Sequence, residues 1–200
     1  MKGVGAQDDS GTKIVMLLDS SGSMNNIRDD VIGSVNSFVE QQQKQKLDDK
    51  ATFSLAQFDS KMRWIWDNVP LAQVKSLVAK DYVVNGGTAL LDSIGDTIAR
   101  HDNDRDVVLV ICTDGQDNES RRFSQKQIKE LLARKKADAG WDVIYLSCDE
   151  AGFAAGHALG VGAGDNLRVA KAAMSSNISY AMSSVVCNKR VAKSIAKSTQ

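Results

Sequence analysis

Short apolar runs that alternate with longer amphipathic patterns constrain the fold of this chain more than any other feature of its sequence. Three runs are almost continuously apolar, as is typical of central strands covered on both faces: Lys13 to Leu18, Val107 to Thr113 and Asp142 to Ser147. Between the first two, side chains such as Val31 and Val35 recur at helical spacing. Alternating strands and helices predict an α/β fold with three α-β-α layers around a Rossmann-like, mostly parallel central sheet.

One antiparallel strand is expected at or near an edge of this sheet. Ala51 to Phe58 reads as a strand, and Met62 to Val69 follows it after a short polar segment, so the two runs predict a β-hairpin. Trp64 and Trp66 lie one residue apart on the second strand and should share a face. This favours packing on the sheet over an exposed aromatic platform.

The rest of the chain carries helical patterns and weaker strand signals. Ser124 and Gln127 form a capping box that predicts a helix start. The Ala/Gly-rich segment Glu150 to Gly160 predicts a short helix, and Leu167 to Ala170 a short edge strand. We expect one domain over residues 12–200, including a C-terminal helix, preceded by a flexible tail of residues 1–11 without the apolar region of a secretory signal.

Composition limits the possible environments and partners. The formal net charge is +0 and the longest apolar stretches are too short to span a bilayer, so neither nucleic acid nor a membrane is an expected partner. The basic C-terminal segment is better explained by Lys193 and Lys197 complementing a helix dipole. The scattered cysteines Cys112, Cys148 and Cys187 suit reduced thiols in the cytoplasm; a Cys112–Cys148 disulfide is the alternative.

Five polar side chains lie where strands end or helices begin. Asp19, Ser21 and Ser23 follow the first apolar run, Thr88 precedes a helix, and Asp114 follows the second central run. Ligands of open α/β sheets gather beyond the carboxyl ends of the strands, so these loops are expected to converge. Carboxylates and hydroxyls are hard oxygen donors, which favour Mg²⁺, with Mn²⁺ or Ca²⁺ as alternatives, over zinc or copper.

The segments around these residues resemble a known site. DSSGSM at 19–24, GGTALLD at 86–92 and TDGQDN at 113–118 are similar to the three segments of the metal-ion-dependent adhesion site of von Willebrand factor type A domains. The finer similarity is to small stand-alone bacterial and phage proteins of that family. The resemblance implies that Ser21 and Ser23 bind the metal directly, that Thr88 and Asp114 bind it directly or through water, and that Asp19 acts mostly through water and the serines.

The resemblance also implies a function in protein binding. An Asp or Glu of a partner protein would complete the metal shell, and in the family's best-known members ligand binding is linked to movement of the C-terminal helix, here within Ala172 to Lys197. An assembly subunit of a virus particle or cytoplasmic complex, with the metal as a static joint, is the alternative. An enzyme is not expected: phosphate-transferring enzymes of the haloacid dehalogenase type would use Asp19 as nucleophile but need an acid where Ser21 stands.

Two further expectations concern the loops themselves. Asp117 and Asn118 could support the site or contact a partner, but a solvated loop is the favoured interpretation. Alanine at position 19 or 114 is expected to remove metal binding and leave the sheet folded, because both aspartates are expected to lie beyond the strands.

Overall fold

The computed structural model describes residues 11–45, 47, 50–168 and 177–198. The predicted tail, apart from Gly11, and the last two residues of the predicted edge strand at 167–170 lie outside these ranges. A six-stranded sheet forms the centre of the fold, in the order β3-β2-β1-β4-β5-β6. Its strands are β1 (Lys13–Asp19), β2 (Thr52–Phe58), β3 (Met62–Pro70), β4 (Val107–Thr113), β5 (Asp142–Ser147) and β6 (Asn166–Arg168).

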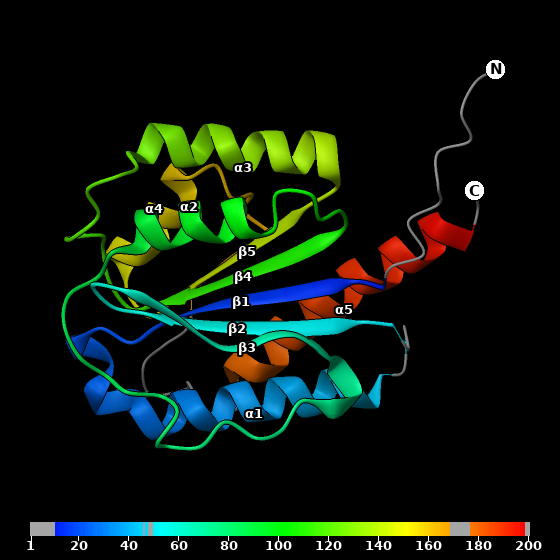
Figure 1. The fold of residues 1–200 in the computed structure, drawn as a ribbon, viewed down its shortest axis with the longest axis horizontal. Coiled ribbons are helices and arrows are strands. Elements are labelled where there is room, and N and C mark those ends of the chain that lie inside the picture. The colour runs from blue at the N-terminus through cyan, green and yellow to red at the C-terminus, as the bar shows by residue number, and fades with distance from the viewer. Residues whose placement is uncertain (1–10, 46, 48–49, 169–176, 199–200) are drawn as a thin grey trace.

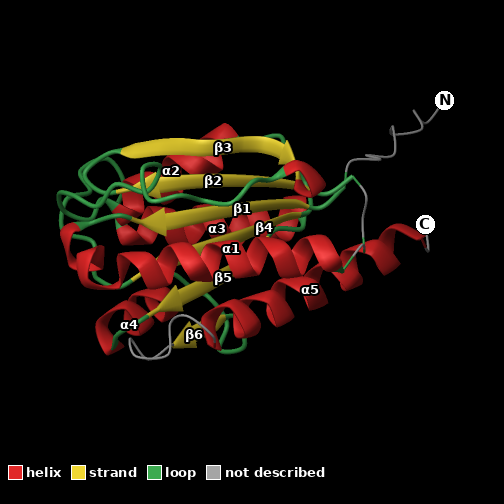
Figure 2. Cartoon of the chain, turned by 90° about the horizontal axis from the view of Figure 1, so that it is seen from below, coloured by secondary structure: helices red, strands yellow, loops and turns green. Residues whose placement is uncertain are grey.

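Helices cover both faces of the sheet and complete the predicted three layers (Figure 1). Helices α1 (Arg28–Lys44) and α5 (Asn177–Ser198) lie side by side on one face, as Figure 2 also shows. Helices α2 (Leu90–Arg100), α3 (Gln125–Ala139) and α4 (Glu150–Ala158) lie on the other. Two short 3-10 helices, η1 (Gly22–Ile27) and η2 (Leu71–Gln73), complete the regular structure.

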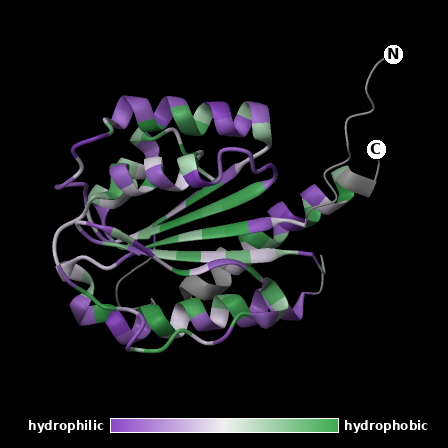
Figure 3. Ribbon diagram, viewed as in Figure 1, coloured by the Kyte–Doolittle hydropathy of each residue, from purple (hydrophilic) through white to green (hydrophobic). Residues whose placement is uncertain are grey.

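The central strands are apolar because each contributes side chains to two separate cores. Met16 and Val110 belong to the core beneath α1, whereas Leu17 and Ile111 belong to the core beneath α2 and α3. Every residue of β4 is buried, and the central strands are among the most hydrophobic parts of the chain (Figure 3). A strand buried on both faces reads as an unbroken apolar run, which explains the pattern in the sequence.

Strand order reverses between β1 and β4, and this reversal positions the candidate site. β1 pairs in parallel with β2 on one side and with β4 on the other. The connections from β1 and β4 therefore leave the sheet in opposite directions at the carboxyl ends of two neighbouring strands. Such a point leaves room for a ligand between the loops.

The predicted hairpin is confirmed, and so is the expectation that its tryptophans pack on the sheet, but the expectation that they share a face is wrong. β3 pairs antiparallel with β2 at the sheet edge, with Leu55 opposite Trp66 and Ala56 opposite Trp64. Ile65 is therefore an extra residue in a β-bulge, and the bulge breaks the alternation of side chains along the strand. Trp66 packs on Phe53 in the core beneath α1, whereas Trp64 joins the core beneath α2.

Lys189 and Lys193 of α5 form ion pairs rather than complementing a helix dipole, and the buried Arg190 donates hydrogen bonds to Gln42 of α1. Lys193 Nζ lies 3.0 Å from an oxygen of Asp142, and Lys189 Nζ lies 3.2 Å from the other oxygen and 3.1 Å from Asp165. These contacts attach α5 to the start of β5. The side chain of Lys197 lies outside the described part.

Cys112, Cys148 and Cys187 are all free thiols, so the alternative of a Cys112–Cys148 disulfide is wrong. None of the helices in the described residues is long and apolar enough to cross a membrane.

Asp92, in the first turn of α2, holds the loop that leads from β4 into α3. Its carboxylate accepts hydrogen bonds from the backbone amides of Arg121, Arg122 and Phe123 at 3.0 to 3.1 Å. Burial alone would raise the pKa of Asp92, but these amides and the Arg122 guanidinium outweigh it and lower the pKa below its usual range. The loop after Asp114 is therefore anchored at its far end.

We predict that Asp92→Asn lowers the free energy of unfolding at neutral pH by about 1 to 3 kcal/mol, because charge-assisted hydrogen bonds are weakened. A lowered pKa means that this contribution is present above the unfolded pKa, near ~3.9, and is lost as pH falls through the folded pKa. Urea unfolding from neutral pH down to pH values below the unfolded pKa measures this contribution to the free energy of unfolding. Asp138→Asn, at an exposed position of α3, should change nothing; a pH-independent difference for Asp92→Asn would contradict the assignment.

Candidate metal site

Three loops meet at the carboxyl ends of β1 and β4. The first begins at Asp19, the last residue of β1, and continues into η1. The second, residues 85–89, leads into α2, and the third follows Thr113 at the end of β4. These are the loops in which the sequence places the five predicted ligands.

Backbone hydrogen bonds hold the second loop against the first and third. The amide of Gly22 donates to the carbonyl of Gly86 at 3.0 Å, and the amide of Asn85 donates to the carbonyl of Ser20 at 2.8 Å. On the other side, Thr88 donates its amide to the Asn118 side chain at 2.8 Å and accepts from the Asn118 amide at 3.0 Å. Thr88 is thereby fixed between the loops that carry the serines and Asp114.

Side-chain hydrogen bonds connect the other four predicted ligands. Asp19 Oδ1 accepts from the Ser21 amide at 2.7 Å, and the hydroxyls of Ser21 and Ser23 lie 3.1 Å apart. Ser23 Oγ donates to Asp114 Oδ1 at 2.6 Å, although the two residues are 91 positions apart in the chain. The structure therefore gathers these four residues into one polar chain of contacts.

The site is buried on one side and open on the other. Asp19 is 0% exposed, whereas Ser23 is exposed to solvent. Burial is the largest cause that raises the pKa of Asp19; hydrogen bonds from Thr113 and Ser21 lower it, and the negative charge of Asp114 raises it again, so that the pKa lies above its usual range. Two buried carboxylates near each other carry an electrostatic cost that a cation would offset.

The donor chemistry fits a hard divalent cation. Two carboxylates and three hydroxyls supply only oxygen ligands, and few of them are charged. Within the described ranges no group of three or more His, Cys, Asp or Glu side chains is arranged to hold a metal. A cation here would be held by Asp19, Ser21, Ser23, Thr88 and Asp114 and would keep enough positive charge to attract a further anionic ligand.

The interpretation of Asp117 and Asn118 as a solvated loop is wrong. Asp117 accepts from the Leu91 amide at 2.9 Å and from the Ser120 amide at 3.2 Å, and Asn118 holds Thr88 as described above. Both side chains cap backbone amides around the start of α2, so they support the second loop. Their position inside TDGQDN was the only signal for this role.

Sequence reasoning missed two further supports, Thr113 and Tyr82. Thr113 Oγ1 donates to Asp19 Oδ2 at 2.6 Å, and the buried Tyr82 hydroxyl donates to the Asp19 carbonyl. The pairing of the strand ends could have indicated Thr113, because it precedes Asp114 directly. No pattern in the sequence indicates that Tyr82 supports Asp19.

The structure also corrects the reasoning behind the expected substitutions. Asp19 belongs to β1 and is fully buried, so it does not lie beyond the strand as expected. Replacing Asp19 with alanine removes the acceptor for Thr113 and Ser21 and opens a buried space. Asp114 follows β4 directly and is the better position for testing the metal.

No family model and no curated protein matches the sequence, but 170 chains of solved structures match the fold. A von Willebrand factor type A protein from Catenulispora acidiphila superposes over 87% of this chain and 42% of its own, with a TM-score of 0.59 and 15% sequence identity. The chain has the von Willebrand factor type A fold.

Two other structures with this fold are of metal-bound proteins. Proximal thread matrix protein 1 from the mussel byssus, described with a zinc-occupied metal-ion-dependent adhesion site, matches 87% of this chain and 48% of its own at 14% identity and a TM-score of 0.56. The manganese-loaded TRAP protein from Plasmodium vivax matches 84% and 72% at 13% identity and a TM-score of 0.57. This chain spans less than half the length of the Catenulispora and mussel chains.

We predict that Thr113→Val lowers the free energy of unfolding by about 1 to 3 kcal/mol, because a buried oxygen of Asp19 loses its donor while the shape is kept. Denaturant unfolding in EDTA measures the change. Thr97→Val is the matched control: Thr97 is equally buried, but its hydroxyl donates to a helix carbonyl, that of Ser93, at 2.8 Å. Equal losses of unfolding free energy in both variants would show that the hydrogen bond to Asp19 stabilises the protein no more than the one to the helix carbonyl.

Proposed function

We propose that this chain is a divalent-metal-dependent protein-binding module. A cation held by the five loop residues is bridged to an Asp or Glu side chain of a partner protein. The von Willebrand factor type A fold and the metal-bearing neighbours support a metal-dependent interaction in general. Partner bridging, the choice of metal and a complete adhesion site are parts of the proposal.

The contact between Ser23 and Asp114 carries the proposal. It joins the loop after β1 to the loop after β4 through a hydroxyl and a carboxylate, both hard donors, at 2.6 Å. Ser23 is exposed, so a cation bound there is accessible to a partner. Mg²⁺ is the proposed cation because it accepts such oxygen ligands in small number and keeps exchangeable positions.

The basic residues of α5 also bear on the choice of partner. Lys189 and Lys193 are paired with Asp142 at the start of β5. These two lysines therefore add little to any phosphate-binding surface, and we propose neither nucleic acid nor a membrane as partner. The three free thiols support a reducing compartment, and we propose a cytoplasmic, stand-alone bacterial or phage protein.

A static assembly joint is the second candidate, and an enzyme is not proposed. The same metal geometry would serve a virus particle or cytoplasmic complex if the association did not reverse. A phosphate-transferring enzyme needs an acid two residues after Asp19. This chain has Ser21 there, and the Ser21 hydroxyl contacts Ser23. Reversible, chelator-sensitive association distinguishes the module from the joint.

Thermal unfolding in EDTA, Mg²⁺, Mn²⁺ and Ca²⁺ tests the metal. A ligand that binds only the folded state stabilises it by about 2.7 kcal/mol at a hundredfold excess over its dissociation constant, so we expect a clear rise in melting temperature. The rise should vanish in Asp114→Ala and persist in Asp138→Ala, which removes an exposed carboxylate of α3. A metal-dependent rise of equal size in both variants would place the cation elsewhere.

A further inference from the structure

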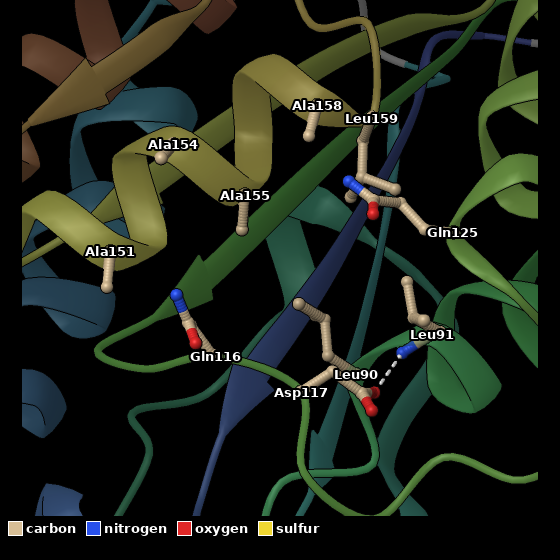
Figure 4. Close-up of a pocket in the computed structure, with 10 residues that line it drawn as sticks. All are labelled: Leu90, Leu91, Gln116, Asp117, Gln125, Ala151, Ala154, Ala155, Ala158 and Leu159. Carbon is tan, nitrogen blue, oxygen red and sulfur yellow. Dashed lines mark hydrogen bonds between the residues drawn. The ribbon is translucent and has the colours of Figure 1, made fainter.

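A pocket of about 430 Å³ lies beside the candidate metal site, on the face covered by α2, α3 and α4 (Figure 4). The alanines of α4 form one wall, and Leu90 and Leu91 of α2 form the opposite wall. Leu159 closes one end, whereas Gln116 and Asp117 lie at the end where β4 finishes. Its volume lies within the range of sites that bind ligands of moderate size.

The pocket and the metal site share the loop after β4, and the pocket also uses the start of α2, directly after the loop that carries Thr88. Leu90 follows Thr88 by two residues, and Gln116 follows Asp114 by two residues. Two residues of chain span at most about 7 Å, so the pocket begins within that distance of two proposed metal ligands. A partner residue on the cation therefore has neighbours that reach the pocket.

The one carboxylate that lines the pocket already accepts hydrogen bonds from within the protein. This carboxylate, Asp117, accepts hydrogen bonds from the Leu91 amide at 2.9 Å and from the amide and hydroxyl of Ser120. The remaining lining is aliphatic except for the amides of Gln116 and Gln125. An uncharged apolar group fits such walls, whereas a charged group would lose its hydration without a partner.

The metal site and the pocket lie side by side but suit two chemically different groups, and one partner can supply both. The cation requires a carboxylate, and the pocket requires an apolar side chain. We propose that the partner segment carries an Asp or Glu and, two to four residues away, a large apolar side chain such as Phe, Trp or Leu that fills this pocket. This inference rests on the proposed metal-dependent function and adds the chemistry that would select the partner.

A single buried apolar side chain of this size provides much of the affinity in many interfaces. The carboxylate alone would give metal-dependent binding to almost any acidic surface. The pocket adds discrimination, because a partner without the apolar residue leaves it open to water. The two sites together therefore recognise a short motif rather than a single charge.

Selection of peptides from a phage-displayed random library on the purified chain in Mg²⁺, with elution by EDTA, tests the motif. We expect the enriched peptides to share an acidic residue and a large apolar residue at a fixed spacing. A synthetic peptide of the enriched sequence then serves as the probe for calorimetry. Enriched peptides with the acid but no apolar residue would overturn the pocket and leave the metal-binding module intact.

Variants of α4 test whether the apolar side chain of the peptide binds in the pocket. Ala158→Leu fills the pocket and should weaken the peptide by about tenfold, the value for losing one buried apolar side chain. His157→Leu places a leucine at the neighbouring exposed position outside the pocket and should change affinity by less than about twofold. Replacing the apolar residue of the peptide with alanine should cause the same loss as Ala158→Leu, and the two losses should not add.

The remaining outcomes separate the two proposals. Loss of all enrichment in Asp114→Ala, with enrichment retained in Ala158→Leu for acidic peptides, is the expected pattern. Peptides that bind the pocket equally in Mg²⁺ and EDTA would overturn both the motif and the metal-dependent function. Equal weakening by Ala158→Leu and His157→Leu would overturn the pocket, provided that both variants melt as the wild type does.

Discussion

The parallel pairing of β1 with β4 is the constraint on which the site depends. Leu18 pairs with Cys112, so the next residues along each strand, Asp19 and Thr113, end the two strands together. The hydroxyl of Thr113 donates to Asp19 Oδ2, and Asp114 follows at once. Because both strands are packed on both faces, a change of register would exchange side chains between the two cores and disrupt their packing. The sheet therefore fixes the relative position of the two carboxylates.

Hydrogen bonds between the loops hold the remaining parts of the site in place. Asn118 and Asp117 cap amides at the second loop and the start of α2, and Asp92 holds the amides of residues 121–123. These carboxylates and amides have their hydrogen bonds satisfied within the protein. The remaining hydroxyls and the two buried aspartates are the groups whose chemistry suits a cation. Rigid support beneath an exposed, hydroxyl-rich surface is what a reversible metal contact requires.

Much of this arrangement could be predicted from the sequence. Continuous apolar runs and a capping box are local signals, and they identified the strands, the hairpin and the start of α3. The three motifs placed the candidate ligands at strand and helix ends. The roles of Thr113 and Tyr82 depend on contacts with Asp19 across 94 and 63 positions. Such contacts follow from strand register and loop path, which no local pattern encodes.

The prediction that the two tryptophans share a face failed for a related reason, although both pack on the sheet as expected. Alternation along β3 assumes regular pairing, but pairing with β2 shifts between Phe53 and Leu55 and again between Leu55 and Ala56. Whether a strand carries a bulge depends on its partner strand, so the facing of Trp64 and Trp66 was not a property of β3 alone.

The same irregularities have a consequence for the outer border of the sheet. β3 is the long edge strand, and a regular edge strand presents a row of free amides and carbonyls to which other chains can add. In β3 the extra residue Ile65, the positive φ of Asn68 (52°) and the missing amide hydrogen of Pro70 interrupt that row. Strand addition and runaway aggregation along this border are thereby disfavoured, even though the strand carries two tryptophans and an isoleucine.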